Sequence, residues 1–116
     1  MNEYIFEKID YDNDSTWALK DFFNSLHLQN RLIYGVGNII TKCGFVINET
    51  YCHYPDLQGV DPDFHFEGIM FGVWEGEIIV SEDIGFKYTR LACEKYLKLH
   101  PEDSEKVNSL LDELPA

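Results

Sequence analysis

The sequence lacks long apolar runs. No stretch approaches the roughly 18 consecutive apolar residues that a membrane-spanning helix requires. Residues 1–8 also lack the basic start and the following apolar stretch of a secretory signal. These two absences predict a protein that is neither exported nor inserted into a membrane, and we expect it in the cytoplasm.

Cysteine is scarce as well. Cys43, Cys52 and Cys93 have no CxxC spacing, so neither a disulfide framework nor a closed zinc site is indicated. Cys93 follows Ala92 on the apolar side of a predicted helix, where an inert thiol is expected rather than the nucleophile of a Cys–His pair. We therefore expect reduced thiols that are buried as small hydrophobic residues.

Basic residues are outnumbered, since 9 Lys and Arg stand against 21 Asp and Glu and give a net charge of −12. A chain of this charge is repelled by the phosphates of nucleic acids and by anionic membrane surfaces. The glycines form neither a GxGxxG nor a GxxxxGK[ST] phosphate-binding loop. Direct binding of nucleic acid, nucleotide or membrane is therefore not expected, and neither is a cofactor.

The acidity is concentrated in the middle of the chain. Residues 43–86 contain no Lys or Arg and carry −9 of the charge, whereas residues 1–42 carry −2 and residues 87–116 carry −1. Solubility alone does not require such an uneven distribution. The acidic residues of this middle third are Glu49, Asp56, Asp61, Asp63, Glu67, Glu75, Glu77, Glu82 and Asp83.

Bulky core material is plentiful, because 8 Phe, 7 Tyr and 2 Trp occur among the 116 residues. This length and composition predict one globular domain over residues 1–116. A first helix capped by Ser15 or Asp14 is predicted to end near His27. A second is predicted from Leu32 to Cys43, with Gly44 as its left-handed terminator. The apolar positions of the first are Trp17, Ala18, Leu19, Phe22, Phe23 and Leu26.

The residue pattern changes to that of strands after Gly44. We predict one strand over 45–53, a loop over 54–59, and further strands over 64–74 and 77–80. The last two are joined by Glu75 and Gly76, a two-residue connection in which the glycine would take a positive φ. The expected fold class is therefore α+β, with an antiparallel sheet of about three to four strands flanked by N-terminal and C-terminal helices.

The C-terminal third is predicted to be helical. A helix begins at Ser81, Glu82 and Asp83, where carboxylates favour the positive end of the helix dipole, and runs to about Leu99. Pro101 ends that helix and begins another. The predicted buried stripe of the longer helix is Ile84, Tyr88, Leu91, Ala92, Tyr96 and Leu99, and that of the last helix is Val107, Leu110, Leu111 and Leu114.

The most enzyme-like pattern places acids and one imidazole at alternate positions, namely Asp61, Asp63, His65 and Glu67. In an extended segment these side chains would share a face and could hold a divalent cation or transfer protons. Pro62 argues against a regular strand there. A small metal-dependent enzyme is therefore kept as an alternative, while we expect no enzyme, no catalytic residue and no metal.

Aromatic residues alternate with the carboxylates of the middle third. Such a composition is typical of protein-binding surfaces, in which charge attracts a basic partner and rings supply contact area. The predicted binding residues are Tyr54, Asp56, Asp61, Asp63, Glu67, Trp74 and Glu75. An acidic regulatory module with some other basic partner fits the same pattern.

Three stretches, residues 66–73, 77–82 and 92–97, resemble a family of immunity proteins from bacterial contact-dependent growth inhibition systems. The likeness covers roughly residues 64–114 and includes the string His100-Pro101-Glu102-Asp103. It implies a cytosolic antidote that binds the C-terminal toxin domain of a delivered effector, commonly a nuclease acting on transfer RNA, and blocks its active site. It supplies no catalytic residue, and the matching strings mark scaffold.

Overall fold

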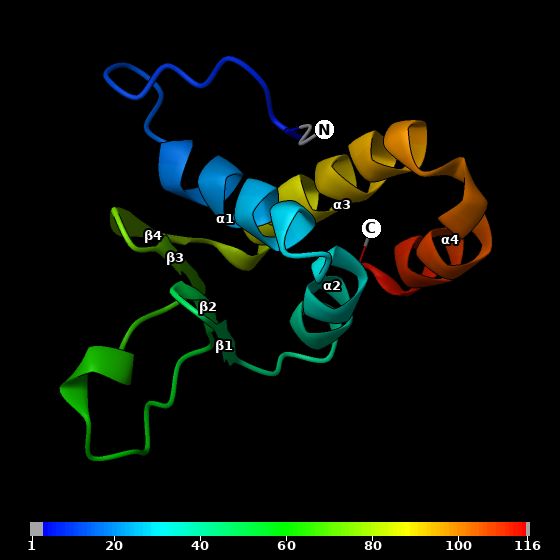
Figure 1. The fold of residues 1–116 in the computed structure, drawn as a ribbon. Helices are drawn as coiled ribbons and strands as arrows, with labels where there is room; N and C mark the ends of the chain where they lie inside the picture. Colours follow the sequence, from blue (N-terminus) through cyan, green and yellow to red (C-terminus); the bar gives the residue numbers. More distant parts are fainter. Residues whose placement is uncertain (1–3, 116) are drawn as a thin grey trace.

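The computed structural model describes residues 4–115, which form an α+β fold with four α-helices and a four-stranded antiparallel sheet (Figure 1). The predicted fold class is thereby confirmed. The helices are α1 (Trp17–Leu28), α2 (Leu32–Ile40), α3 (Glu82–Leu99) and α4 (Ser104–Glu113). The strands are β1 (Phe45–Ile47), β2 (Thr50–His53), β3 (Ile69–Val73) and β4 (Gly76–Val80), and they lie side by side in chain order.

The segment predicted as one strand over 45–53 forms two. Asn48 and Glu49 reverse the chain, and Ile47 then pairs with Thr50. Asn48 takes a φ of 54°, a left-handed conformation that asparagine tolerates better than most residues. The sequence prediction missed this reversal because the turn carries no glycine and the β-rich residues continue on both sides of it.

The predicted β3–β4 hairpin is confirmed, but its turn is displaced by one residue. Val73 pairs with Gly76, so the two turn residues are Trp74 and Glu75. Gly76 therefore belongs to β4 and does not have a positive φ, contrary to expectation. Gly68 is the glycine with a positive φ, at 96°, and a Cβ atom at this position would collide with the carbonyl oxygen of Val80.

The strand expected from Phe64 begins only at Ile69. Residues Pro62–Phe64 form a short 3-10 helix instead, because the Asp61 side chain accepts a hydrogen bond from the amide of Asp63 and closes a turn. A second 3-10 helix, Pro101–Asp103, precedes α4, so the last α-helix begins at Ser104 and not at the proline.

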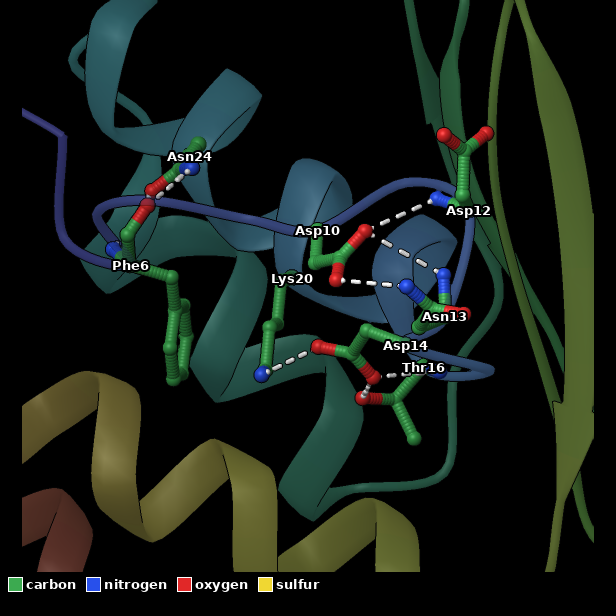
Figure 2. Close-up of polar contacts among 8 residues, drawn as sticks. All are labelled: Phe6, Asp10, Asp12, Asn13, Asp14, Thr16, Lys20 and Asn24. Atoms are coloured by element: carbon green, nitrogen blue, oxygen red, sulfur yellow. Dashed lines mark hydrogen bonds and ion pairs between the residues drawn. The ribbon is translucent and has the colours of Figure 1, made fainter.

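The helix ends agree with the predictions only in part. Asp14 does accept hydrogen bonds from the amide and hydroxyl of Thr16, and its second oxygen contacts Lys20 at 2.5 Å, but the N-cap of α1 is Thr16 (Figure 2). The second helix ends at Ile40, and Lys42, not Gly44, takes the left-handed conformation with a φ of 58°. The cap of α3 is as predicted, since Ser81 Oγ accepts from the amide of Ile84.

The core lies between α1 and one face of the sheet. Phe22 of α1 is fully buried and contacts Phe71 of β3 with 4.9 Å between ring centroids. The inward positions of β1 and β2, Phe45 and Cys52, are buried as well. On the opposite face Ile79 is exposed, although its partner Met70 is buried, so this side of the antiparallel sheet is partly solvated.

The buried face of α3 is rotated from the predicted stripe. Ile84 is exposed, while Phe86, Thr89 and Cys93 are buried. Cys52 is also buried, and burial raises the pKa of both thiols to about 12. Cys43 is exposed, so the prediction of a buried thiol is wrong for this residue, because α2 ends before reaching it. The four apolar positions predicted for the last helix, Val107, Leu110, Leu111 and Leu114, all pack on the core.

Candidate functional site

The predicted binding residues lie in two separate places. Asp56, Asp61, Asp63 and Glu67 belong to residues 54–68, which connect β2 to β3 and are called the acidic loop here. Trp74 and Glu75 form the β3–β4 turn. Strand β3 separates the two places, with about 13 Å of extended backbone between its ends. The structure therefore does not bring the seven predicted residues together.

The acidic loop has local hydrogen bonds but exposed carboxylates. Asp56 donates its amide to the carbonyl of Phe64 at 2.8 Å, and His65 Nε2 lies 2.6 Å from the carbonyl oxygen of Gly59. Phe64 packs edge-on against His53, with 5.1 Å between ring centroids, and so attaches the loop to β2. The four loop carboxylates are exposed, which leaves them available to a partner but strongly hydrated.

Tyr54 is less available than a binding anchor would be. Its ring is half-buried, and its hydroxyl donates to the carbonyl oxygen of Ile39 at 2.6 Å. Burial raises the pKa of this phenol well above its usual range. Tyr54 therefore joins the start of the acidic loop to α2.

The side chains of the suggested metal site do not assemble. The 3-10 helix at Pro62–Phe64 breaks the extended geometry that would have aligned Asp61, Asp63, His65 and Glu67. Within residues 4–115, no group of three or more His, Cys, Asp or Glu side chains could hold a metal ion. The alternative of a metal-dependent enzyme thus finds no site in the described part of the chain.

A concave surface of about 540 Å³ lies at the other end of the sheet, and we call it the turn-end groove. Asp21, Asn24, Ser25 and Leu28 form one wall, since their spacing places them on one face of α1. The other walls come from the β1–β2 turn, the β3–β4 turn and Tyr4.

A hydrogen-bond network holds the floor of this groove together. Ser25 Oγ lies 2.5 Å from Thr50 Oγ1, and Gln29 donates to both hydroxyls at 3.1 Å. Asn48 donates in turn to Gln29 Oε1 at 2.6 Å. The β1–β2 turn is thereby attached to the C-terminal half of α1, so the groove is formed before any partner binds.

The N-terminal segment closes one side of the groove through Asn24. This buried side chain accepts from the amide of Phe6 at 2.8 Å and donates to the carbonyl of the same residue at 2.9 Å (Figure 2). Asn24 thus satisfies both backbone polar groups of Phe6, and Tyr4 also lines the groove.

Negative charge is concentrated in the turn-end groove. Asp21, Glu49 and Glu75 all line it, and no Lys, Arg or His does. Desolvation and the nearby Glu75 raise the pKa of Asp21 above its usual value, although the hydroxyl of Tyr11 donates to it at 2.9 Å. Desolvation, the bond to Asp21 and the charge of Glu75 raise the pKa of Tyr11 to about 12. A cation would stabilise these carboxylates.

Aromatic and aliphatic side chains form the rim of the groove. Trp74 is 76% exposed, which is unusual for the side chain that buries the most apolar area, and Tyr4 and Leu28 are 53% and 42% exposed. Sequence reasoning found Trp74 and Glu75 through the acidic middle third but did not select Asp21 or Glu49. Glu49 could have been selected, because it is one of the nine acids of residues 43–86. Nothing in the sequence near Asp21 indicated that α1 would place this residue beside Glu75.

A second hollow of about 630 Å³ lies between the acidic loop and the sheet face opposite α1. Tyr51 covers Gly72 there, at a position where a Cβ atom would collide with the phenol ring. Its hydroxyl donates to Glu77 Oε1 at 2.5 Å, so this carboxylate already has a partner. The hollow is therefore less strongly charged toward a ligand than the turn-end groove.

None of the helices within residues 4–115 is both long and apolar enough to cross a membrane.

In comparisons with known proteins, no curated protein sequence matches the chain significantly. The fold is similar to the crystal structure of an immunity protein from Neisseria meningitidis MC58, with a TM-score of 0.76 and 17% identity. That likeness covers 97% of this chain and 99% of the other. At such low identity it establishes the shared fold alone.

The family comparison extends further than the resemblance seen in the sequence. The model of a family described as CDI immunity protein, where CDI is contact-dependent growth inhibition, matches residues 15–111. The match therefore includes α1, α2 and the first two strands, which the sequence resemblance had not reached. Because it spans most of the 116 residues, the chain belongs to the family of CDI immunity proteins.

Proposed function

We propose that this immunity protein acts in the bacterial cytosol, where it binds the C-terminal domain of a CDI effector that is a nuclease acting on transfer RNA. Membership of the family implies that the chain neutralises a toxin. The proposal adds the chemistry of that toxin and the manner of its inhibition, in which the acidic side of the immunity protein covers the basic active-site surface.

The observation that carries the proposal is the uncompensated charge of residues 43–86. This segment holds nine carboxylates and no Lys or Arg. Within residues 4–115, the ion pairs reach only one of the nine, Glu82, which lies 3.1 Å from Lys42. Charge that the protein does not neutralise internally is available for a partner.

The electrostatics favour a nuclease as that partner. An enzyme that cleaves RNA must present Lys and Arg to phosphates, and a surface that places carboxylates at comparable positions competes for the same groups. Association between oppositely charged proteins is also fast at low salt, which suits an antidote that must act before the toxin does.

The test is co-expression of this protein with the toxin domain encoded beside its gene. Cell growth, co-purification and the integrity of transfer RNA are scored in the same cultures. We expect growth to be rescued, a stable complex to be recovered and transfer RNA to remain intact. An unrelated immunity protein of similar net charge serves as the control for non-specific electrostatic binding.

Two outcomes would contradict the proposal in different ways. Rescue of growth with a complex, but with a toxin domain that leaves all RNA intact when expressed alone, would keep the immunity role and reject the nuclease. Failure to bind or rescue would reject the toxin as partner and favour the acidic regulatory module, whose basic partner would then be sought directly.

A further inference from the structure

We propose that the turn-end groove receives cationic side chains of the partner protein, an arginine foremost, and that it makes the specific contact, whereas the acidic loop does not. This inference rests on the proposed function, because it identifies where the toxin domain would be held. It assigns a role to Asp21 and Glu49, which the acidic middle third had not brought forward as binding residues.

The shape of the groove is set before binding. A hydrogen-bond network joins α1 to the β1–β2 turn through Ser25, Gln29, Asn48 and Thr50. The open hollow beside it has a volume of about 540 Å³, which is in the size range of ligand-binding clefts. A preformed site loses little conformational entropy on binding, so more of its contact energy contributes to affinity. The acidic loop is attached to α2 and β2 through Tyr54 and Phe64, and these contacts do not involve its carboxylates.

The charge of the groove selects a cation. Glu49 and Glu75 have no hydrogen-bond or ion-pair partner within the described residues, and Asp21 accepts one hydrogen bond from Tyr11. With no basic residue in the lining, an anionic ligand would be repelled, and an uncharged one would leave the carboxylates uncompensated on desolvation.

The spacing of the carboxylates favours a guanidinium group over a metal ion. The three acids are not among any set of side chains in residues 4–115 that could hold a metal, so they do not converge on one point. A guanidinium group is planar and carries five N–H donors in a rigid fork, which allows one arginine to contact separated carboxylates.

Trp74 supplies the second half of such a site. Its ring lies at the rim, next to Glu75 in the chain, and is largely exposed. Arginine stacks on tryptophan through the electrostatic attraction between its cation and the ring face, and this contact strengthens when water is excluded. Exposed tryptophan beside unpaired acids is thus the composition expected of an arginine-binding site in a protein interface.

The experiment compares two triple neutralisations that change the net charge equally. The groove variant is D21N/E49Q/E75Q and the loop variant is D56N/D63N/E67Q, which leaves the turn-closing Asp61 in place. Dissociation constants and association rates are measured against the toxin domain encoded beside the gene, catalytically inactivated, at low and at physiological salt. Thermal unfolding of each variant checks that the fold is retained.

We expect the groove variant to raise the dissociation constant at least about tenfold more than the loop variant at physiological salt. The loop variant should chiefly slow association, and only at low salt. A smaller difference, or a larger loss in the loop variant, overturns the inference while leaving the proposed function intact. Wild-type protein that fails to bind this toxin domain rejects both.

The variant Trp74→Leu tests the ring separately from the charge. The side chain is exposed, so we expect the unfolding temperature to change little. The dissociation constant should rise about tenfold, mainly through faster dissociation. An unchanged dissociation rate would exclude Trp74 from the interface and overturn the proposed site.

Discussion

The acidic loop takes all its carboxylates from one stretch of chain, residues 54–68, whereas the turn-end groove assembles three from α1 and two separate turns. The loop acids are exposed, and the hydrogen bond that Asp61 accepts from the amide of Asp63 closes a turn within the loop. The groove acids line a concave surface together with the exposed Trp74, and a hydrogen bond between Ser25 and Thr50 holds its floor. Four carboxylates of the loop and three of the groove therefore present negative charge in two ways, along one exposed segment and around one concave surface.

This difference matters because charges spread along a loop and charges gathered on one concave surface contribute to binding differently, although Glu49 and Glu75 are themselves exposed. Exposed carboxylates mainly speed up encounter and are screened by salt. Carboxylates that line one concave surface together attract a bound cation, and the walls of the surface shield that attraction from part of the solvent. The substitutions predicted next change either residues that support the groove or residues that shape the acidic loop.

The largest expected effect comes from the core that supports the groove. Phe22 is fully buried in α1 and contacts Phe45 as well as Phe71. Phe22→Ala should lower the free energy of unfolding by about 3–5 kcal/mol, through lost burial and the cavity left behind. Chemical denaturation checks this, and Leu57→Ala, in the exposed part of the acidic loop, should change stability by less than about 0.5 kcal/mol.

The next effect concerns the point where the acidic loop enters β3. Gly68→Ala should lower the free energy of unfolding by about 1–3 kcal/mol, because Gly68 has a φ of 96° and a Cβ atom there meets the carbonyl of Val80. Gly37→Ala is the matched control in α2, since nothing lies within 4 Å of its Cβ position. It should stabilise by about 0.4–1 kcal/mol, and equal effects of the two variants would contradict the structure.

Removing a hydrogen-bonding group from the floor of the groove should lower the free energy of unfolding more than removing the one that closes the turn in the acidic loop. Thr50→Val removes a buried hydroxyl that Ser25 and Gln29 share, and we expect it to cost about 1–2 kcal/mol. Asp61→Ala removes one exposed hydrogen bond to the amide of Asp63 and should cost less than about 1 kcal/mol. Hydrogen exchange at the β1–β2 turn would show whether the first change loosens the groove.

The smallest effect is a pH dependence of opposite sign at two aspartates. Because the folded-state pKa of Asp21 is raised, its contribution to stability falls as pH rises through and above 3.8, so Asp21→Asn should stabilise at neutral pH and not at pH 3. The pKa of Asp14 is lowered to about 2, chiefly by its hydrogen bond to Lys20. The ionised Asp14 side chain therefore stabilises the fold above pH 3.8, and this stabilisation is lost as the pH falls toward 2. Asp14→Asn should accordingly destabilise the protein at neutral pH.

Thermal unfolding between pH 2 and pH 7 measures both variants. The same sign of change for the two would contradict the environments described for them. A stabilising Asp21→Asn that also weakens toxin binding would show that the groove keeps a carboxylate at some cost to the fold, as functional sites often do.

Much of the fold follows from local patterns. The 3.6-residue spacing of Leu19, Phe22, Phe23 and Leu26 correctly predicted α1, and the Ser81 cap correctly predicted the start of α3. The errors fall where a single backbone conformation decides, as with the positive φ of Asn48 that splits one predicted strand into two. Such reversals depend on pairing between strands, which a local window does not contain.

The candidate site was less predictable than the fold. Trp74 and Glu75 were selected because acids and aromatics alternate in the chain, but the same reasoning joined them to the acidic loop, which lies at the other end of β3. Asp21 and Glu49 were not selected, because their proximity to Glu75 arises from the packing of α1 across the sheet.

The sequence by itself determined the fold class, the concentration of negative charge in residues 43–86 and the likeness to CDI immunity proteins, because these depend on composition and local order. Only the tertiary structure decided which carboxylates share a surface. Residues 21, 49 and 75 become neighbours through a helix packed on a sheet and two turns at one sheet end, and no property of their local sequence carries that information.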